Sequence, residues 1–142
     1  GGQPQVMQIV ARELRIDHGM LAVAANWFSW GLPEGLFAPA EIRHGIHGGA
    51  IETSIMLAVA PQVVRLELAR TDYGSEGAPG IFATPSTMQS TDPARRDYSA
   101  TGAYGDPTLA SAEKGRAILA AMIEDLVGGL VALFPDLAAD PR

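Results

Sequence analysis

Near the start of the chain, hydrophobic residues recur with the period of a helix. Residues 4–17 predict an amphipathic helix that carries Val6, Ile9, Val10 and Leu14 on one face. Gly19 suits the end of that helix. The hydrophobic run at 20–28 (MLAVAANWF) follows. Because it is short and continuous, it predicts a buried strand, most easily a parallel one.

Beyond this run, the pattern predicts a loop, a helix and a weak strand. Residues 29–46 contain Pro, Gly and scattered charges and indicate a loop. A second helix is predicted from about residue 50 to 60, and it ends near Pro61. This helix is almost wholly apolar, so we expect it to be buried nearly all round. Residues 62–68 (QVVRLEL) alternate and predict an exposed strand.

The last part of the chain combines a long irregular segment with a long helix. Residues 70–107 are rich in Gly, Pro, Ser, Thr and Asp, which predicts an unusually long loop. The helix follows, with Thr108 or Ser111 as its cap. Gly128 and Gly129 within it indicate close approach of another backbone. Its hydrophobic stripe consists of Ile118, Leu119, Met122, Ile123, Leu126, Val127, Leu130, Val131 and Phe134.

This order of elements predicts part of an α/β layered fold, and residues 1–142 are one domain's worth of chain. One clear strand among three helices makes a sheet too small to be covered on both faces. The first helix also begins almost at residue 1, with no strand before it. We therefore expect the chain to be the second half of something larger, or to complete its core with a partner.

Composition narrows the classes of function. The 142 residues are 47% hydrophobic and carry a formal net charge of −6, as in an ordinary soluble protein, and this charge argues against a nucleic-acid partner. No hydrophobic run approaches the length of a membrane span, and no signal peptide is visible. The absence of cysteine excludes disulfides and thiolate metal sites and fits a cytoplasmic location. Any metal would be held by His, Asp and Glu.

The segment with the most chemical interest is His47–Ser54 (HGGAIETS). Glu52 opens the apolar second helix, and a buried carboxylate needs a helix N-terminus, a base or a metal ion as its partner. Along a helix, His47 and Glu52 would lie roughly 140° apart, so they converge only if Gly48 and Gly49 turn the chain first. From spacing alone, a dipole-stabilised carboxylate beside a loop histidine is the favoured interpretation.

Other residues carry weaker signals. Trp27 follows the predicted strand and could stack on a flat ligand, although a core aromatic is the better interpretation from position alone. Ser29 and Ser54 lack an evident His/Asp relay, which makes a serine nucleophile a poor interpretation. The glycines at 45–49 lack a following Lys and phosphate-loop spacing, so they support nucleotide binding only weakly.

Taken together, several segments resemble the creatininase (creatinine amidohydrolase) family. HGGAIETSIMLAVAP at 47–61 is similar to the family's H-[AG]-G-x-x-E-T-S signature and the residues after it. Asn26-Trp27 resembles the dipeptide after the family's strand, and Gly105–Gly115 resembles its late G-D-P helix entrance. Gly1-Gly2-Gln3 looks like the tail of its N-G-H-G-G-N motif.

The resemblance implies a metal-dependent hydrolase of a cyclic or small amide, with a three-layer α/β/α fold, a mainly parallel sheet and a homo-oligomeric, commonly hexameric, assembly. It implies a binuclear zinc or manganese site, most of whose ligands lie in motifs outside this chain, so that the chain is the C-terminal portion of the domain. His47 would be the proton carrier, Glu52 a metal ligand, and Trp27 a substrate-binding residue with Gly48 and Gly49.

Departures from the creatininase pattern leave the substrate open. Ile46 stands where creatininase has a Glu beside the motif histidine, which argues against creatinine itself and favours another amide. The alternatives are a formamide or peptide hydrolase of the same family, and a catalytically silent fragment or assembly subunit.

Overall fold

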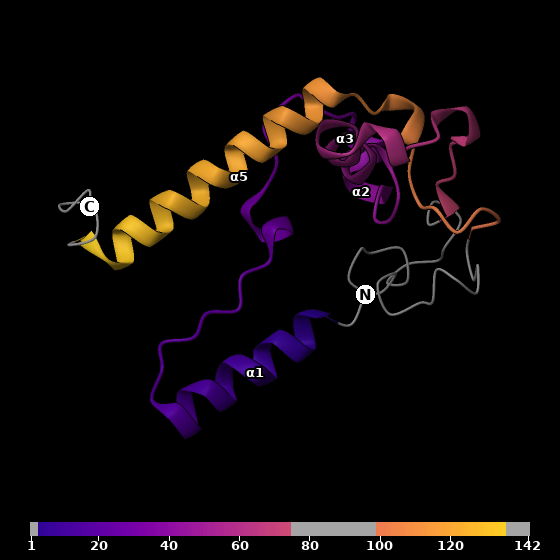
Figure 1. Cartoon of the computed structure of the whole chain (residues 1–142). Coiled ribbons are helices and arrows are strands. Elements are labelled where there is room, and N and C mark those ends of the chain that lie inside the picture. Colours follow the sequence, from indigo (N-terminus) through magenta and orange to yellow (C-terminus); the bar gives the residue numbers. More distant parts are fainter. Residues whose placement is uncertain (1–2, 75–98, 136–142) are drawn as a thin grey trace. The chain divides into compact units, whose positions relative to one another are not determined.

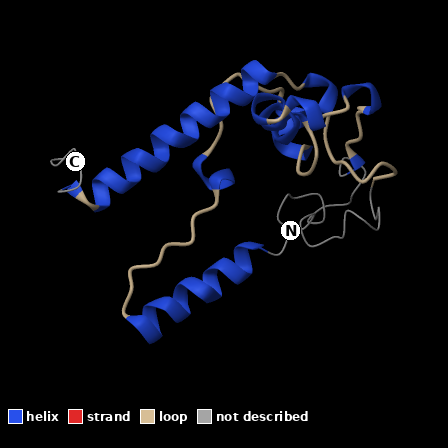
Figure 2. Cartoon of the chain, viewed as in Figure 1, coloured by secondary structure: helices blue, strands red, loops and turns tan. Residues whose placement is uncertain are grey.

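The computed structural model describes residues 3–74 and 99–135 of the chain. Outside these residues lie Gly1 and Gly2, which resemble the tail of the N-G-H-G-G-N motif, and the centre of the loop predicted at 70–107. The chain divides into two compact units, residues 1–31 and residues 32–142. In the described part, helices are joined by irregular segments, and β-type pairing is limited to two isolated bridges (Figure 2).

The first unit contains α1 (Gln3–His18), which confirms the first predicted helix, and the short 3-10 helix η1 (Trp27–Trp30). Gly19 follows α1 with a φ of +63°, in agreement with its predicted role as the end of the helix. The predicted strand at 20–28 is wrong, since residues 19–26 are irregular and η1 begins at Trp27. A parallel strand needs neighbouring strands to pair its backbone, and the described residues supply none to this run.

The second unit is built on three helices, α2 (Pro39–His44), α3 (Ala50–Val59) and α5 (Ala112–Leu133). α2 lies inside the segment predicted as a loop, and Pro39 at its first turn suits a helix start. The predicted strand at 62–68 is also wrong. Its place is taken by η2 (Pro61–Val63) and η3 (Leu66–Leu68), two 3-10 turns joined by Val64 and Arg65, of which only Val64 is extended.

The core of this unit lies where α3 packs against the N-terminal half of α5 (Figure 1). Ile51 and Ile118 are buried there, and Gly115 lies so close to α3 that a Cβ would overlap the carbonyl of Ser54. The fully buried Ser54 hydroxyl accepts a hydrogen bond from the Ser111 N–H at 3.1 Å. Ser111 in turn caps α5 by accepting from the Lys114 N–H at 3.2 Å, so the predicted cap is confirmed at Ser111.

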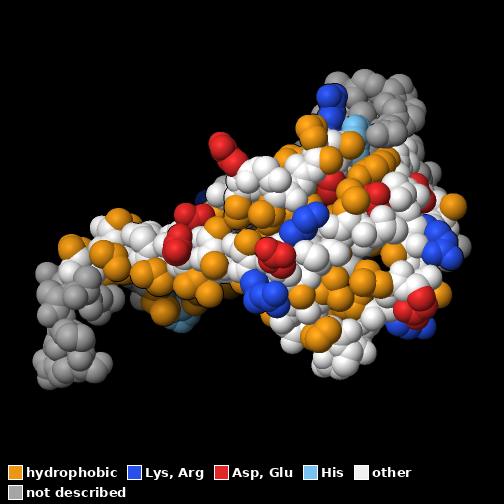
Figure 3. Space-filling view, turned by 90° about the horizontal axis from the view of Figure 1, so that it is seen from above, with side chains coloured by type: hydrophobic (Ala, Val, Ile, Leu, Met, Phe, Trp, Pro, Cys, Tyr) orange, Lys and Arg blue, Asp and Glu red, His pale blue; other side chains and the backbone are white. Residues whose placement is uncertain are grey.

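Much of the hydrophobic surface of these helices is exposed in the described structure. On α3, Val59 is 58% exposed, so the expectation of a helix buried nearly all round is wrong. Along α5, hydrophobic side chains continue past the packed half toward the C-terminus (Figure 3). A Cβ added to Gly128 or Gly129 would meet no atom within 4 Å, so the close backbone approach expected there occurs at Gly115 instead.

The described helices include no candidate membrane span. None of them combines the length and the hydrophobicity that crossing a bilayer requires.

Candidate active site

A tight turn before α3 carries the histidine and the glycines of the motif. Gly48 has a φ of +63°, in the left-handed region that glycine adopts without strain, and Gly49 is the N-cap of α3. An antiparallel bridge to Tyr104 holds the backbone of His47. Its N–H donates to the Tyr104 carbonyl at 3.3 Å and its carbonyl accepts from the Tyr104 N–H at 2.7 Å. The backbone of His47 is therefore fixed by a segment far along the chain.

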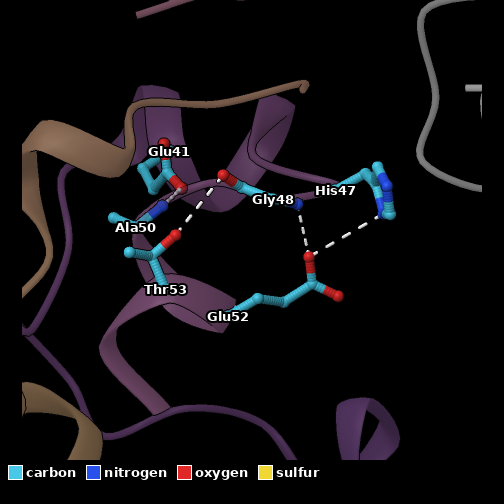
Figure 4. A network of polar contacts seen from close by, with 6 residues as sticks. All are labelled: Glu41, His47, Gly48, Ala50, Glu52 and Thr53. Carbon is cyan, nitrogen blue, oxygen red and sulfur yellow. Dashed lines mark hydrogen bonds and ion pairs between the residues drawn. The ribbon is translucent and has the colours of Figure 1, made fainter. Parts of the chain in front are cut away.

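The turn brings His47 and Glu52 together, as its glycines predicted. The distance from His47 Nδ1 to Glu52 Oε2 is 3.9 Å, and the same Glu52 oxygen accepts a hydrogen bond from the Gly48 N–H (Figure 4). The His47 side chain is 54% exposed and that of Glu52 37% exposed. An accessible imidazole beside a carboxylate can exchange protons with a bound molecule, while the carboxylate orients the ring.

A carboxylate that sequence reasoning did not single out lies directly behind this turn. Glu41, on α2, has no exposed surface. Its Oε1 accepts from the Ala50 N–H at 2.5 Å, and its Oε2 accepts from the Tyr73 hydroxyl at 3.0 Å and from the Asp106 N–H at 2.8 Å. These donors satisfy a charge that would be very costly to bury alone.

The sequence carries only an indirect signal for Glu41. Its segment reads as an ordinary loop with scattered charges, and two of its three donors are far away in sequence. The local hint is the spacing of Gly45 and Gly49, four and eight residues after it. A Cβ on either glycine would overlap the Glu41 side chain.

A polar cluster supports the segment that pairs with His47. Asp72 and Gly105 form a second antiparallel bridge, with N···O distances of 2.9 and 2.7 Å. The Asp72 carboxylate also accepts from the hydroxyl of Ser99 at 2.7 Å and from that of Thr101 at 3.3 Å. Ser99 is 3% exposed and accepts from the Gly102 N–H at 3.0 Å. Residues 99–106 are thus anchored on both sides of the bridge to His47.

The described residues do not form a metal site by themselves. They contain no group of three or more His, Cys, Asp and Glu side chains that could surround an ion. The Glu52 carboxylate is a suitable donor and would supply part of a coordination sphere, with the His47 imidazole beside it.

Trp27, predicted to bind substrate, belongs to the other compact unit. It is partly buried at the start of η1. Its role in binding substrate, and the roles predicted for His47, Gly48, Gly49 and Glu52, remain predictions.

The chain is similar to curated peptidases. It is 31% identical over 137 residues to the mycofactocin precursor peptide peptidase of Mycobacterium ulcerans, covering 95% of this chain and 46% of that protein. It is 41% identical over 81 residues to the protein of the same name from Mycobacterium tuberculosis strain H37Rv, covering 57% of this chain and 30% of that protein. The chain therefore spans less than half the length of these relatives.

Solved structures with a similar fold are creatininases, which are α/β proteins. A glutamate-to-glutamine mutant of creatininase complexed with creatine matches with a TM-score of 0.60 and 26% identity, over 90% of this chain and 50% of the other. A Zn–Zn form of that mutant matches with a TM-score of 0.59 and 26% identity, over 90% and 49%. The creatininase family model, described as creatinine amidohydrolase, matches residues 1–130. This match covers most of the chain and includes the His47–Glu52 turn, so the chain belongs to the creatininase family of hydrolases.

Proposed function

We propose that the protein hydrolyses an amide C–N bond and that this chain supplies the proton carrier of the reaction, His47. The observation that carries the proposal is the contact of His47 with Glu52 at an accessible turn, within the motif that carries the family resemblance. The family match over residues 1–130 favours this role over the interpretation from spacing alone, a dipole-stabilised carboxylate beside a loop histidine.

The proposed reaction needs one proton to move twice. Water attacks the amide carbonyl carbon, and His47 accepts a proton from that water as the new C–O bond forms. The same proton is then delivered to the leaving nitrogen as the C–N bond breaks, which yields a carboxylic acid and an amine. Glu52, 3.9 Å from Nδ1, orients the imidazole.

Metal dependence is part of the proposal. Glu52 would hold or orient a zinc or manganese ion whose remaining ligands lie outside the described residues, and similarity to a Zn–Zn creatininase supports this assignment. Such an ion, when bound, polarises the carbonyl and lowers the pKa of a bound water.

Among amides, a peptide is the substrate that the comparisons favour. The curated relatives are named as peptidases of a precursor peptide, and their identity to this chain exceeds that of the creatininases. The exposure of His47 would admit an extended substrate as well as a small one. The second candidate is a small cyclic amide like creatinine, which the creatine-bound structural neighbour supports. In either case Gly48 and Gly49 are the proposed substrate contacts of the second unit, and the substrate-binding role of Trp27, in the first unit, stays a prediction.

The test is His47→Ala in the intact protein, assayed on a panel of creatinine, N-formyl amines and short peptides. We expect kcat to fall by about 10²-fold to 10⁴-fold, the usual contribution of a general acid–base residue. His18→Ala removes an exposed histidine at the end of α1 and is the matched control. Full activity of His47→Ala with metal still bound would eliminate His47 as the proton carrier.

The same preparations test the metal assignment. Glu52→Gln should lower the zinc or manganese content, measured by elemental analysis, whereas Glu67→Gln on the exposed η3 should not. Wild-type protein that neither binds metal nor hydrolyses any member of the panel would support the alternative of a catalytically silent subunit.

A further inference from the structure

Glu41 lies next to the proposed catalytic pair but cannot reach a substrate. It is fully buried, and three glycines crowd around its carboxylate. A Cβ on Gly105 would lie 3.0 Å from Glu41 Oε1, and Cβ atoms on Gly45 and Gly49 would lie closer still. No side chain larger than hydrogen fits at these positions without displacing the carboxylate. Any effect of Glu41 on the reaction must therefore act through other residues.

One oxygen of Glu41 fixes the helix that carries Glu52. The Ala50 N–H, which donates to Oε1, belongs to the first residue of α3, and Glu52 lies in the same turn (Figure 4). The N-cap of α3 is Gly49, which has no side chain to accept from the free N–H groups of the helix. Glu41 thus takes the place of the missing capping side chain and sets the position of the first turn.

The other oxygen fixes the segment that holds His47. The Asp106 N–H donates to Glu41 Oε2. Asp106 lies two residues beyond Tyr104, whose backbone N–H and carbonyl both pair with the backbone of His47. The Tyr73 hydroxyl donates to the same oxygen. Tyr73 directly follows Asp72, which forms the bridge to Gly105. The two segments that determine the separation of His47 from Glu52 therefore meet at one carboxylate.

We infer that Glu41 is a positioning residue that sets the geometry of the His47–Glu52 pair through the backbone of Ala50 and Asp106. This inference rests on the proposed function, because it gives the pair a catalytic role. It assigns to Glu41 an effect on turnover, with little effect on substrate affinity.

The test is Glu41→Gln in the intact protein. The substitution preserves size but replaces one acceptor oxygen by an NH₂ group, which faces an N–H or O–H donor in either orientation. We expect kcat to fall by about 10-fold to 100-fold at an unchanged KM, since a mispaired group shifts the backbone on one side of the pair. Glu67→Gln, on the exposed η3, should leave both constants unchanged.

A double-mutant cycle separates positioning from general destabilisation. If Glu41 acts through the pair, Glu41→Gln should lower kcat in wild type but cause no further loss in the His47→Ala background. An equal loss in both backgrounds, or a rise in KM at constant kcat, would overturn the inference. If Glu41→Gln does not fold by circular dichroism, Tyr73→Phe removes one donor and keeps the carboxylate. That variant should lower kcat about 2-fold to 10-fold at constant KM, and an unchanged kcat would overturn the inference.

The cycle also distinguishes the role of Glu41 from that of His47. An inactive His47→Ala combined with a folded, fully active Glu41→Gln would overturn the role of Glu41 alone. A fully active His47→Ala would overturn the proposed function and, with it, the positioning role.

Discussion

Gly48 and Gly35 have nearly the same backbone conformation in different surroundings. Their φ values are +63° and +73°, but Gly48 donates to Glu52 whereas a Cβ on Gly35 would have no atom within 4 Å. Replacing either glycine by alanine should lower the free energy of unfolding by about 1–2 kcal/mol, because a Cβ disfavours the left-handed region. Only Gly48→Ala should also lower hydrolysis, since a shifted turn separates His47 from Glu52. Urea unfolding and kcat measurements on both variants would check this, and equal activity losses would argue against a special role for the turn.

The residues of the site differ in how far the sequence reveals them. The contact between His47 and Glu52 is local, so two adjacent glycines were sufficient to predict it. Glu41 depends on donors 32 and 65 residues away, and no local pattern places Tyr73 or Asp106 beside it. The antiparallel bridge that holds His47 through Tyr104 was missed for the same reason.

At the scale of elements, the contact between α3 and α5 depends on one glycine. A Cβ on Gly115 would overlap the carbonyl of Ser54 and lie 2.9 Å from the Ala58 Cβ. Gly115→Ala should therefore destabilise the protein by about 1–3 kcal/mol, as overpacking does in a close-packed core. Gly128→Ala, in the open part of the same helix, should instead stabilise it by up to about 1 kcal/mol through helix propensity. Thermal unfolding of both variants measures the contrast, and a neutral Gly115→Ala would show that α5 can move away from α3.

The helices were more predictable than the strands. The signals that predicted α1, α3 and α5 lie within or beside each segment. They are the pattern of hydrophobic residues, Pro61 at the end of α3, and the Ser111 cap of α5. The runs at 20–28 and 62–68 have strand-like patterns but no partner strand among the described residues, and a strand exists only through its neighbours. The short α2 escaped prediction because its six residues are fewer than two turns, too few to show a period.

At the scale of the whole molecule, one end of α5 leaves a hydrophobic surface exposed in the described residues. The exposed hydrophobic residues of the C-terminal half of α5 and its C-cap are Ile123, Leu126, Val127, Leu130, Val131, Leu133 and Phe134. Such a continuous apolar surface is typical of an interface. We therefore expect the intact protein to be a homo-oligomer, as the family resemblance implies.

Light scattering coupled to gel filtration would measure that assembly. The mass should be a whole-number multiple of the subunit mass, and Leu130→Glu should lower it by placing a charge on the exposed stripe. Arg116→Glu, on the exposed side of the packed half of α5, introduces the same side chain and should leave the mass unchanged. A monomeric wild-type protein would contradict the expectation.

The hydrogen bonds of Glu41 have a further consequence for the order in which the protein folds. They join residues 9, 32 and 65 positions apart, and the entropy lost in closing a loop rises with its length. Helices such as α1 and α5 form from local contacts, whereas the long-range contacts that fix His47 come later. A nascent or partly refolded chain would therefore acquire its helical content before the geometry of the His47–Glu52 pair.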